Sequence, residues 1–501
     1  MEDLKNLHNA ETEDSSYKHV LKYTGIFGGV QGLKLVSSLI RNKLTAWLLG
    51  SVGMGLISVY NSISEFIVSS SNFGIPLNAT RLTGELFEEG SEERIRHTVG
   101  VIRTWAFWTA VFAVVVSLLL SPVLSYFFFE HEWNHVLEVF LVCPMVVALL
   151  IAEAECSILK GLRQLQKVAV IETVVAVSTL FTTIPFYYFF GLKGVIVALI
   201  VSTVISAVVH LFYSVRLVSY RISPFSKTVF REGLPMIRRG IPYVLAGIAN
   251  SGVAMAIPAL MLMTNTMSDV GYYRAGYALM VAYAGIAFMA LEADYFPRLS
   301  SLVSDVKRMN QTINQQINVC VLLVTPFLIL LIFCMPWVLS ILYKPDFVVI
   351  QNMAVCSVFY MFFRAIMLPV AYIPLAKGDS LTFLAMEVLY DIQFILLIWW
   401  FYGHMGLTGT GIALSIAALI DMLAIVIFYG WKYGSRLSKS TLRVCVFQFL
   451  FLAIGVAVCL KVDHWMGYVA GAVVLAFSAG CSWNMLYKTR RLNGASSNVS
   501  E

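Results

Sequence analysis

The sequence predicts an all-α polytopic membrane protein with about 14 transmembrane helices, arranged as two six-helix lobes related as parallel repeats plus two C-terminal helices. Three observations lead to this fold class. The chain of 501 residues is 59% hydrophobic and 13% charged, with a mean hydropathy of +0.78, a composition foreign to soluble proteins of this length. Apolar runs of about 20 residues, enough to cross a bilayer, follow one another along the chain. The chain also contains an internal repeat.

The repeat consists of short matched segments that recur at nearly constant spacing. The segment from Gly191 to Leu199, GLKGVIVAL, reappears 215 residues later from Gly406 to Leu414 as GLTGTGIAL. Two shorter pairs recur at offsets of 217 and 218 residues, namely Lys160-Gly161 with Lys377-Gly378 and Ser51-Val52-Gly53 with Asp269-Val270-Gly271. Similar offsets in the same order indicate a duplicated unit. Many secondary transporters are built from such repeats, with the substrate bound between the halves.

The apolar runs define the order of the predicted elements. They are centred near residues 30, 65, 110, 148, 180, 205, 251, 283, 328, 363, 392, 419, 452 and 475. We expect helices, because a chain in lipid must satisfy its own backbone hydrogen bonds. The predicted organisation is a cytoplasmic tail (1–18), an N-terminal six-helix lobe (19–215), a cytoplasmic linker (216–239), a C-terminal six-helix lobe (240–435), an extra helix pair (436–487) and a cytoplasmic tail (488–501).

The basic residues predict the orientation of the chain. With a cytoplasmic N-terminus, about 25 Lys and Arg residues fall in or beside cytoplasmic segments and 6 on the opposite side. Such an excess is the positive-inside bias of membrane proteins, and it places both termini in the cytoplasm. The net charge of +6 follows from this topology, so we expect no nucleic-acid partner.

The sequence does not contain the motifs of several function classes. The eight cysteines lie inside apolar runs without a Cys-x-x-Cys pair, so we expect core thiols rather than metal ligands. No Walker loop and no Gly-x-Ser-x-Gly sequence is present,. We therefore predict a protein that is not an enzyme and has no catalytic residues, no metal and no cofactor. A coupling ion, either a proton or sodium, is left open.

A polar and basic stripe marks one face of the predicted first span. Its members recur at intervals of 3, 4 and 3 residues: Gln31, Lys34, Ser38 and Arg41. Because charged groups inside a membrane usually face a bundle interior or a wet cavity, we predict that this stripe binds substrate. Glu65 of the second span is a candidate for gating or coupling. Alternatively, a Lys34–Glu65 ion pair only joins two helices, and Arg41 extends to the membrane interface.

The second repeat carries its own charged residues. Arg364 lies in the middle of an apolar run and is a predicted substrate-binding residue. Glu387 and Asp391 share one face of the following span, and Arg274 lies at the outer end of an earlier span; we predict gating or coupling roles for all three. The alternative for Arg364 is a structural ion pair with Asp391.

Four segments in order resemble the polysaccharide-biosynthesis flippases, and most closely the O-antigen repeat-unit flippases, of the multidrug/oligosaccharidyl-lipid/polysaccharide exporter superfamily. They are RNKLTAWLLG from Arg41 with the nearby Gly53-Met54-Gly55-Leu56, SILKGLR from Ser157, DVGYYRA from Asp269 and FPRLS from Phe296. In the third segment the alanine comes one residue earlier than in the family. The resemblance covers about residues 18–487.

The resemblance implies a function and its partners. The family's activity is the transfer of undecaprenyl-diphosphate-linked oligosaccharide repeat units, destined for O-antigen, capsule or exopolysaccharide, across the bacterial inner membrane. Implied partners are this lipid-linked glycan, membrane lipids, and the polysaccharide polymerase with its chain-length machinery. We expect a monomer. A polar cavity between two lobes would spare the sugar hydroxyls and the diphosphate a costly passage through hydrocarbon.

Three other functions stay open. A cation-coupled multidrug exporter of the same superfamily would place acidic residues in its first span, whereas this span carries Lys22, Lys34 and Arg41 and no acid. A lipid II flippase would use the same mechanism on a different head group. A membrane component of the polysaccharide pathway that transports nothing, such as a polymerase, would usually have a large outer loop, and every predicted outer loop here is short.

Overall fold

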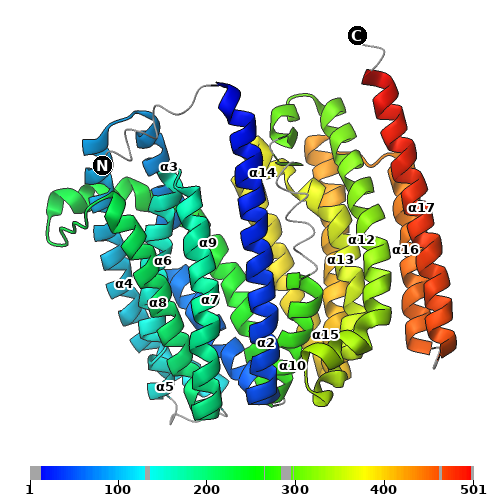
Figure 1. Cartoon of the computed structure of the whole chain (residues 1–501), viewed down its shortest axis with the longest axis horizontal. Helices are drawn as coiled ribbons and strands as arrows, with labels where there is room; N and C mark the ends of the chain where they lie inside the picture. Colours follow the sequence, from blue (N-terminus) through cyan, green and yellow to red (C-terminus); the bar gives the residue numbers. More distant parts are fainter. Residues whose placement is uncertain are drawn as a thin grey trace. The chain divides into compact units, whose positions relative to one another are not determined.

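The protein is a bundle of helices in the computed structural model, which describes residues 13–129, 136–264, 266–283, 295–296, 298–461 and 465–497. No strand occurs among these residues. The chain divides into two compact units, Met1–Gly271 (unit 1) and Tyr272–Glu501 (unit 2). Figure 1 shows that each unit is built from long helices that run roughly alongside one another.

Unit 1 is organised around α6. Its helices are α2 (Glu13–Ser71), α3 (Ile75–Glu88), α4 (Glu92–Phe128), α5 (Val136–Phe140), α6 (Cys143–Gly161), α7 (Leu165–Phe190), the short 3-10 turn η1 (Gly191–Lys193), α8 (Gly194–Leu217), α9 (Lys227–Leu262) and the start of α10 (Met267–Tyr277). Helix α6 packs against α3, α4 and α8, while α2 packs against α7 and α9. The compact unit therefore includes α9 and extends past residue 240, where the sequence places the start of the second lobe. The two boundaries differ because the unit is defined by contacts between helices, whereas the lobe is defined by matched segments of sequence.

Unit 2 is organised around α12 and α13. Its elements are the end of α10, the π-helix η2 (Ala278–Tyr283), α12 (Val306–Leu342), the 3-10 helix η3 (Pro345–Ile350), α13 (Gln351–Ala371), α14 (Ile373–Lys377), α15 (Ser380–Tyr433), α16 (Lys439–Lys461) and α17 (Trp465–Ser497). Helix α13 packs against α12 and the long α15, and α12 also packs against α16 and α17.

The helices confirm the predicted membrane fold. Ten helical segments of the described residues are long and apolar enough to cross a membrane. Three of these segments break at a glycine with positive φ, at Gly50 (67°), Gly191 (56°) and Gly406 (58°), so each supplies two spans and the described residues supply thirteen. All thirteen coincide with predicted runs. The remaining predicted span, centred near residue 283, lies mostly outside the described residues.

The internal repeat is present in the local structure of two hairpins. Gly191 joins α7 to α8 with φ 56° and ψ −136°, and Gly406 joins the halves of α15 with φ 58° and ψ −142°. A Cβ on the following Gly194 would lie 2.5 Å from the carbonyl oxygen of Phe186, and a Cβ on Gly409 would lie 2.1 Å from that of Phe401. The members of each corresponding pair are 215 residues apart: Gly191 and Gly406, Gly194 and Gly409, and Phe186 and Phe401. Both glycines of the motif are thus required, the first by its dihedral angles and the second by close helix packing.

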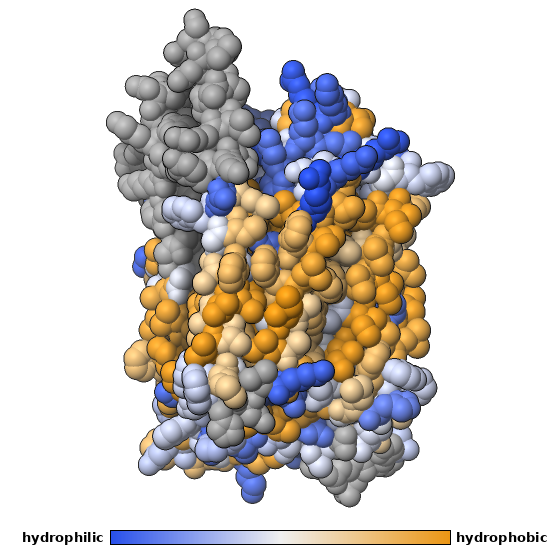
Figure 2. Space-filling view, turned by 90° about the vertical axis from the view of Figure 1, so that its right-hand side faces the viewer, coloured by the Kyte–Doolittle hydropathy of each residue, from blue (hydrophilic) through white to orange (hydrophobic). Residues whose placement is uncertain are grey.

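The surface of the helices is apolar, as a bilayer requires. Large side chains such as Leu119, Phe189, Trp399 and Phe477 are more than half exposed. On the face shown in Figure 2, hydrophobic side chains cover the middle and hydrophilic side chains gather toward the two ends. In water such a surface would be an aggregation hazard, whereas in lipid it is the expected exterior. The protein is therefore a multi-pass membrane protein.

Asp379 ties together the two ends of α15. Its carboxylate caps the first turn by accepting a hydrogen bond from the backbone nitrogen of Thr382, and it also accepts hydrogen bonds from Lys432 Nζ and the Tyr433 hydroxyl, both at 2.7 Å. The Lys432 ammonium and the Tyr433 hydroxyl hold the pKa of the Asp379 carboxyl well below its usual range. This network joins the two ends of the α15 hairpin, whose turn is at Gly406.

A buried ion pair joins three helices of unit 1. Arg103 of α4 and Glu155 of α6 are each 2% exposed, and they form two hydrogen bonds of 2.8 and 3.0 Å. Arg103 also donates to the Ser214 hydroxyl of α8 and to the carbonyl oxygens of Val218 and Ser219. A guanidinium has five N–H donors, so one arginine can donate to all of these acceptors at once. The pair therefore anchors the segment that leads from α8 toward α9.

Candidate functional site

Each unit contains a group of charged side chains at the positions that the sequence predicts as a site, and the two groups are described separately. In unit 1, Lys34 of α2 contacts Glu172 of α7, with 2.5 Å between Nζ and Oε2. Both side chains are about one-third exposed, at 34% and 30%. The sequence suggested Glu65 as the partner of Lys34. In the structure α2 packs against α7, and this packing brings Glu172 to the basic face.

The rest of the predicted stripe follows the same side of α2. Ser38 and Arg41 are half-buried, and the Arg41 guanidinium lies within electrostatic range of the buried Tyr187 hydroxyl. Glu65 is exposed. Gln31 belongs to α2, but its side chain lies outside the described residues. Lys34 and Arg41 thus both face α7, where Lys34 contacts Glu172 and Arg41 lies near Tyr187.

In unit 2 the central cation is Arg364 of α13. It is half-buried, and its Nη1 donates a hydrogen bond of 2.7 Å to the Tyr360 hydroxyl one turn earlier. The hydroxyls of Tyr277 and Tyr390 lie within its electrostatic range. Arg364 therefore sits among three tyrosines, whose rings have apolar faces and whose hydroxyls are polar. This arrangement differs from the ion pair with Asp391 that the sequence left open.

Acidic groups of α15 surround this cation. Glu387 of the first half and Asp421 of the second half are both within electrostatic range of Arg364. Glu387 is exposed and Asp421 half-buried. Asp391 is 6% exposed and interacts electrostatically with Glu387 rather than directly with Arg364. The group thus consists of the Arg364 cation, the nearby carboxylates of Glu387 and Asp421, and the carboxylate of Asp391 next to Glu387.

Arg274 is a further predicted gating or coupling residue. It belongs to α10 and is exposed. Its guanidinium is within electrostatic range of Tyr273 and Tyr277. Tyr277 is also near Arg364, so this tyrosine lies close to both Arg274 and Arg364.

This chemistry suits an anionic, hydroxyl-rich ligand. Lys and Arg both bind phosphate, and Arg does so with two parallel hydrogen bonds. Tyrosines supply ring faces for stacking and hydroxyls for hydrogen bonds. Sequence reasoning missed Tyr360 and Tyr390 and gave Glu172 and Asp421 no specific role. The signal for the two acids was present, since an ionisable residue inside an apolar run marks a functional site by default.

The Lys34–Glu172 pair leads to a prediction. Replacing Lys34 with alanine leaves a partly buried carboxylate without its partner, so we expect the free energy of unfolding to fall by about 1–3 kcal/mol and the protein level in membranes to fall with it. Lys34→Ala combined with Glu172→Gln should restore the protein level, because the uncompensated charge is gone. Immunoblotting of membranes measures this.

The same variants separate a structural role of Lys34 from a ligand-binding role. If Lys34 binds substrate, the double variant stays inactive at normal protein level. A double variant that regains activity as well as abundance contradicts a substrate contact at Lys34. Lys193→Ala is the matched control, because Lys193 is an exposed lysine at the turn between α7 and α8.

Comparisons with known proteins identify a family. The sequence profile of a family described as "Polysaccharide biosynthesis protein" matches residues 86–351, more than half of the chain. No curated protein sequence is detectably similar to this one.

The fold is shared with solved transporter structures. The lipid II flippase MurJ in an inward closed conformation is 12% identical, with 93% of this chain and 100% of that chain covered and a TM-score of 0.71. A multidrug resistance MATE family transporter of the MOP superfamily, facing inward, is 11% identical, with coverages of 86% and 96% and a TM-score of 0.61. A MOP superfamily transporter from Pyrococcus furiosus is 12% identical, with coverages of 82% and 93% and a TM-score of 0.52. At these identities the likeness shows the fold.

Proposed function

Because this chain belongs to the family of polysaccharide biosynthesis proteins, we propose that it is a flippase for undecaprenyl-diphosphate-linked oligosaccharide repeat units of an O-antigen, capsule or exopolysaccharide. It moves them across the bacterial inner membrane by alternating access. In this proposal both termini are cytoplasmic, in keeping with the excess of basic residues on that side. The direction is from the cytoplasmic to the outer leaflet.

The observation that carries the proposal is Arg364 held among tyrosines inside a membrane span. A charge at this depth is costly, and its hydrogen bond to Tyr360 does not neutralise it. A diphosphate or an anionic sugar can bind the guanidinium directly, while the tyrosine rings offer stacking faces to the sugars. In unit 1, Lys34 and Arg41 offer two further cations, with Gln31 and Ser38 as polar neighbours on the same helix.

The acids suit a coupling role in this proposal. When Glu387 and Asp421 are charged, they compete with an anionic substrate for Arg364. A proton or sodium ion bound to these carboxylates weakens that competition and leaves Arg364 to the substrate. Glu65, Asp391 and Arg274 are the further gating or coupling candidates. The membrane potential, negative inside, also favours export, because one negative charge moved outward gains about 2.3 kcal/mol per 100 mV.

A lipid II flippase is the second candidate function. The observation that favours it is the structural likeness to MurJ, which extends over the whole of that chain. Both substrates share the undecaprenyl diphosphate and differ in the head group, so the cations described above serve either one. A multidrug exporter fits less well, because a cationic drug would be repelled by Lys34 and Arg41.

Deletion of the gene in its host distinguishes these functions. The proposal predicts loss of surface polysaccharide and accumulation of the lipid-linked repeat unit inside the cell, with unchanged drug sensitivity. Accumulation of lipid II with cell lysis supports the second candidate instead. Normal surface polysaccharide together with increased drug sensitivity contradicts both flippase functions.

A further inference from the structure

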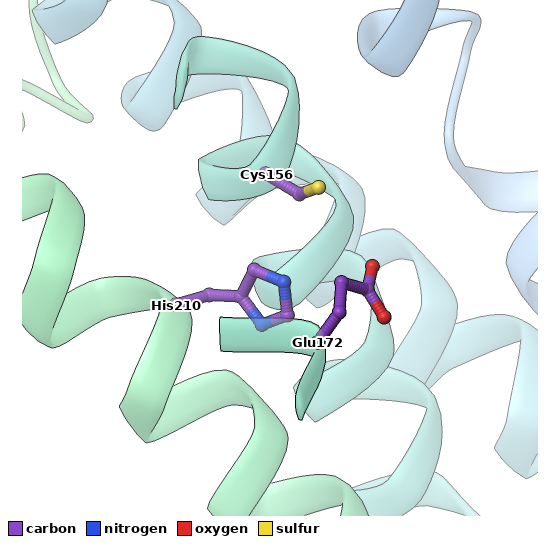
Figure 3. Close-up of side chains that lie close together, drawn as sticks. All are labelled: Cys156, Glu172 and His210. Carbon is purple, nitrogen blue, oxygen red and sulfur yellow. The ribbon is translucent and has the colours of Figure 1, made fainter. Parts of the chain in front are cut away.

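Three side chains that commonly bind metal ions meet inside unit 1. They are Cys156 of α6, Glu172 of α7 and His210 of α8, and one ligand atom of each lies within 4.8 Å of the others. Figure 3 shows the three side chains converging from separate helices. Cys156 is 8% and His210 5% exposed. This group takes no part in the function proposed above except through Glu172.

The histidine is held in an orientation suited to a ligand. His210 Nδ1 lies 2.8 Å from the carbonyl oxygen of Ser206. A carbonyl only accepts, so Nδ1 carries the hydrogen and donates it, and Nε2 keeps its lone pair. Metal-binding histidines almost always donate their other ring N–H in this way, which fixes both the tautomer and the plane of the ring.

The acid and the thiol are supported as well. Glu172 Oε2 is held by Lys34, which orients the carboxylate. Cys156 packs in a buried apolar cluster with Val168 and Ile171 of α7, which holds its sulfur in place.

We propose that Cys156, Glu172 and His210 form a binding site for Zn²⁺ or a similar divalent transition metal in unit 1. One thiolate, one imidazole and one carboxylate are a typical ligand set for zinc, whereas Mg²⁺ and Ca²⁺ prefer oxygen ligands alone. Water completes the tetrahedron, and the thiol proton leaves to solvent on binding. Tetrahedral zinc places its donors about 3.3–3.8 Å apart, so ligand atoms that now lie within 4.8 Å of one another need to approach by at most about 1.5 Å.

The consequence is a clamp across α6, α7 and α8. Bound metal links the three helices and holds Glu172 in place for Lys34. A ligand that binds only the folded state stabilises it according to its concentration and affinity. Removal of the ion should therefore loosen the helix packing around the basic face of α2.

Cobalt(II) serves as the spectroscopic probe of this site. Full-length protein, purified in detergent and stripped with a chelator, should take up one equivalent of Co²⁺ with a thiolate-to-cobalt charge-transfer absorption. Cys156→Ser should lose this absorption and weaken binding at least about 100-fold, since even loss of an outer-shell partner costs about 10- to 100-fold. Cys143→Ser, which changes another buried cysteine of α6, is the matched control and should keep it.

Thermal unfolding measured with and without Zn²⁺ separates loss of metal binding from a folding defect, because each variant is compared with itself. We expect zinc to raise the Tm of the wild type and of Cys143→Ser, and to leave that of His210→Gln and Glu172→Gln unchanged. Zinc should also slow alkylation of Cys156 in the wild type. Absence of the charge-transfer absorption, or an equal zinc effect on Tm in the wild type and in Cys156→Ser, overturns the proposal.

Discussion

Replacing Arg364 with alanine should reduce export of the lipid-linked oligosaccharide about 10- to 100-fold, since a hydrogen bond to a charged group contributes about 1.5–3 kcal/mol and each 1.4 kcal/mol is a factor of ten. The reason is the position of Arg364, which is half-buried in α13 and makes its hydrogen bond to Tyr360 rather than to an acid. Surface polysaccharide, normalised to protein level, measures the effect.

The controls for Arg364 separate charge from folding. Arg364→Lys keeps the positive charge but not the paired hydrogen bonds, so it should retain partial activity. Arg364→Ala with Asp421→Asn relieves any excess of negative charge and should bring the protein level back without restoring export. Arg308→Ala changes an arginine whose side chain is 72% exposed and should behave as wild type. Normal export by Arg364→Ala contradicts the proposed substrate contact.

Replacing Arg103 with alanine should lower the free energy of unfolding by about 3–5 kcal/mol, the usual cost of removing one partner of a buried ion pair. Glu155 is 2% exposed, so it would be left as a buried charge without a partner. The carbonyl oxygens of Val218 and Ser219 would lose their donor as well. A fall in Tm in detergent and a low level in membranes are the expected measurements.

Two comparisons test that interpretation of Arg103. Arg103→Met with Glu155→Met removes both charges and should recover most of the stability, because apolar replacement of a whole buried pair is often neutral or better. Arg81→Ala breaks an exposed pair with Glu85 and should leave the stability close to that of the wild type, because exposed ion pairs contribute little. An Arg103→Ala protein as stable as the wild type contradicts an anchoring role.

Much of the fold was predictable because hydropathy alone determines which segments enter a bilayer. The thirteen described spans coincide with apolar runs, and the repeated glycine motif marked the positions of two helix breaks. The glycines at 191 and 406 are recognisable in the sequence because a break with positive φ favours glycine so strongly. The break at Gly50 has the same cause, and Gly50 directly precedes the matched segment Ser51-Val52-Gly53.

The partners of charged side chains were not predictable in the same way. A stripe on one helix shows which face is polar, but its neighbour depends on how each helix is rotated and which helices pack together. Lys34 therefore pairs with Glu172, 138 positions away in the sequence, a partner that the stripe on α2 could not indicate. Cys156, Glu172 and His210 have no recognisable ligand spacing for the same reason, since α6, α7 and α8 each contribute one residue.

Transport by the purified protein tests the central claim most directly. The protein is reconstituted into liposomes that contain undecaprenyl-diphosphate-linked oligosaccharide in both leaflets, and the sugars exposed outside are oxidised with periodate, which does not cross the bilayer. With wild-type protein, inner-leaflet molecules should reach the outside and become oxidised, and with Arg364→Ala they should stay protected for much longer. Protection of the inner-leaflet pool that is equal in wild-type and protein-free liposomes would contradict the account.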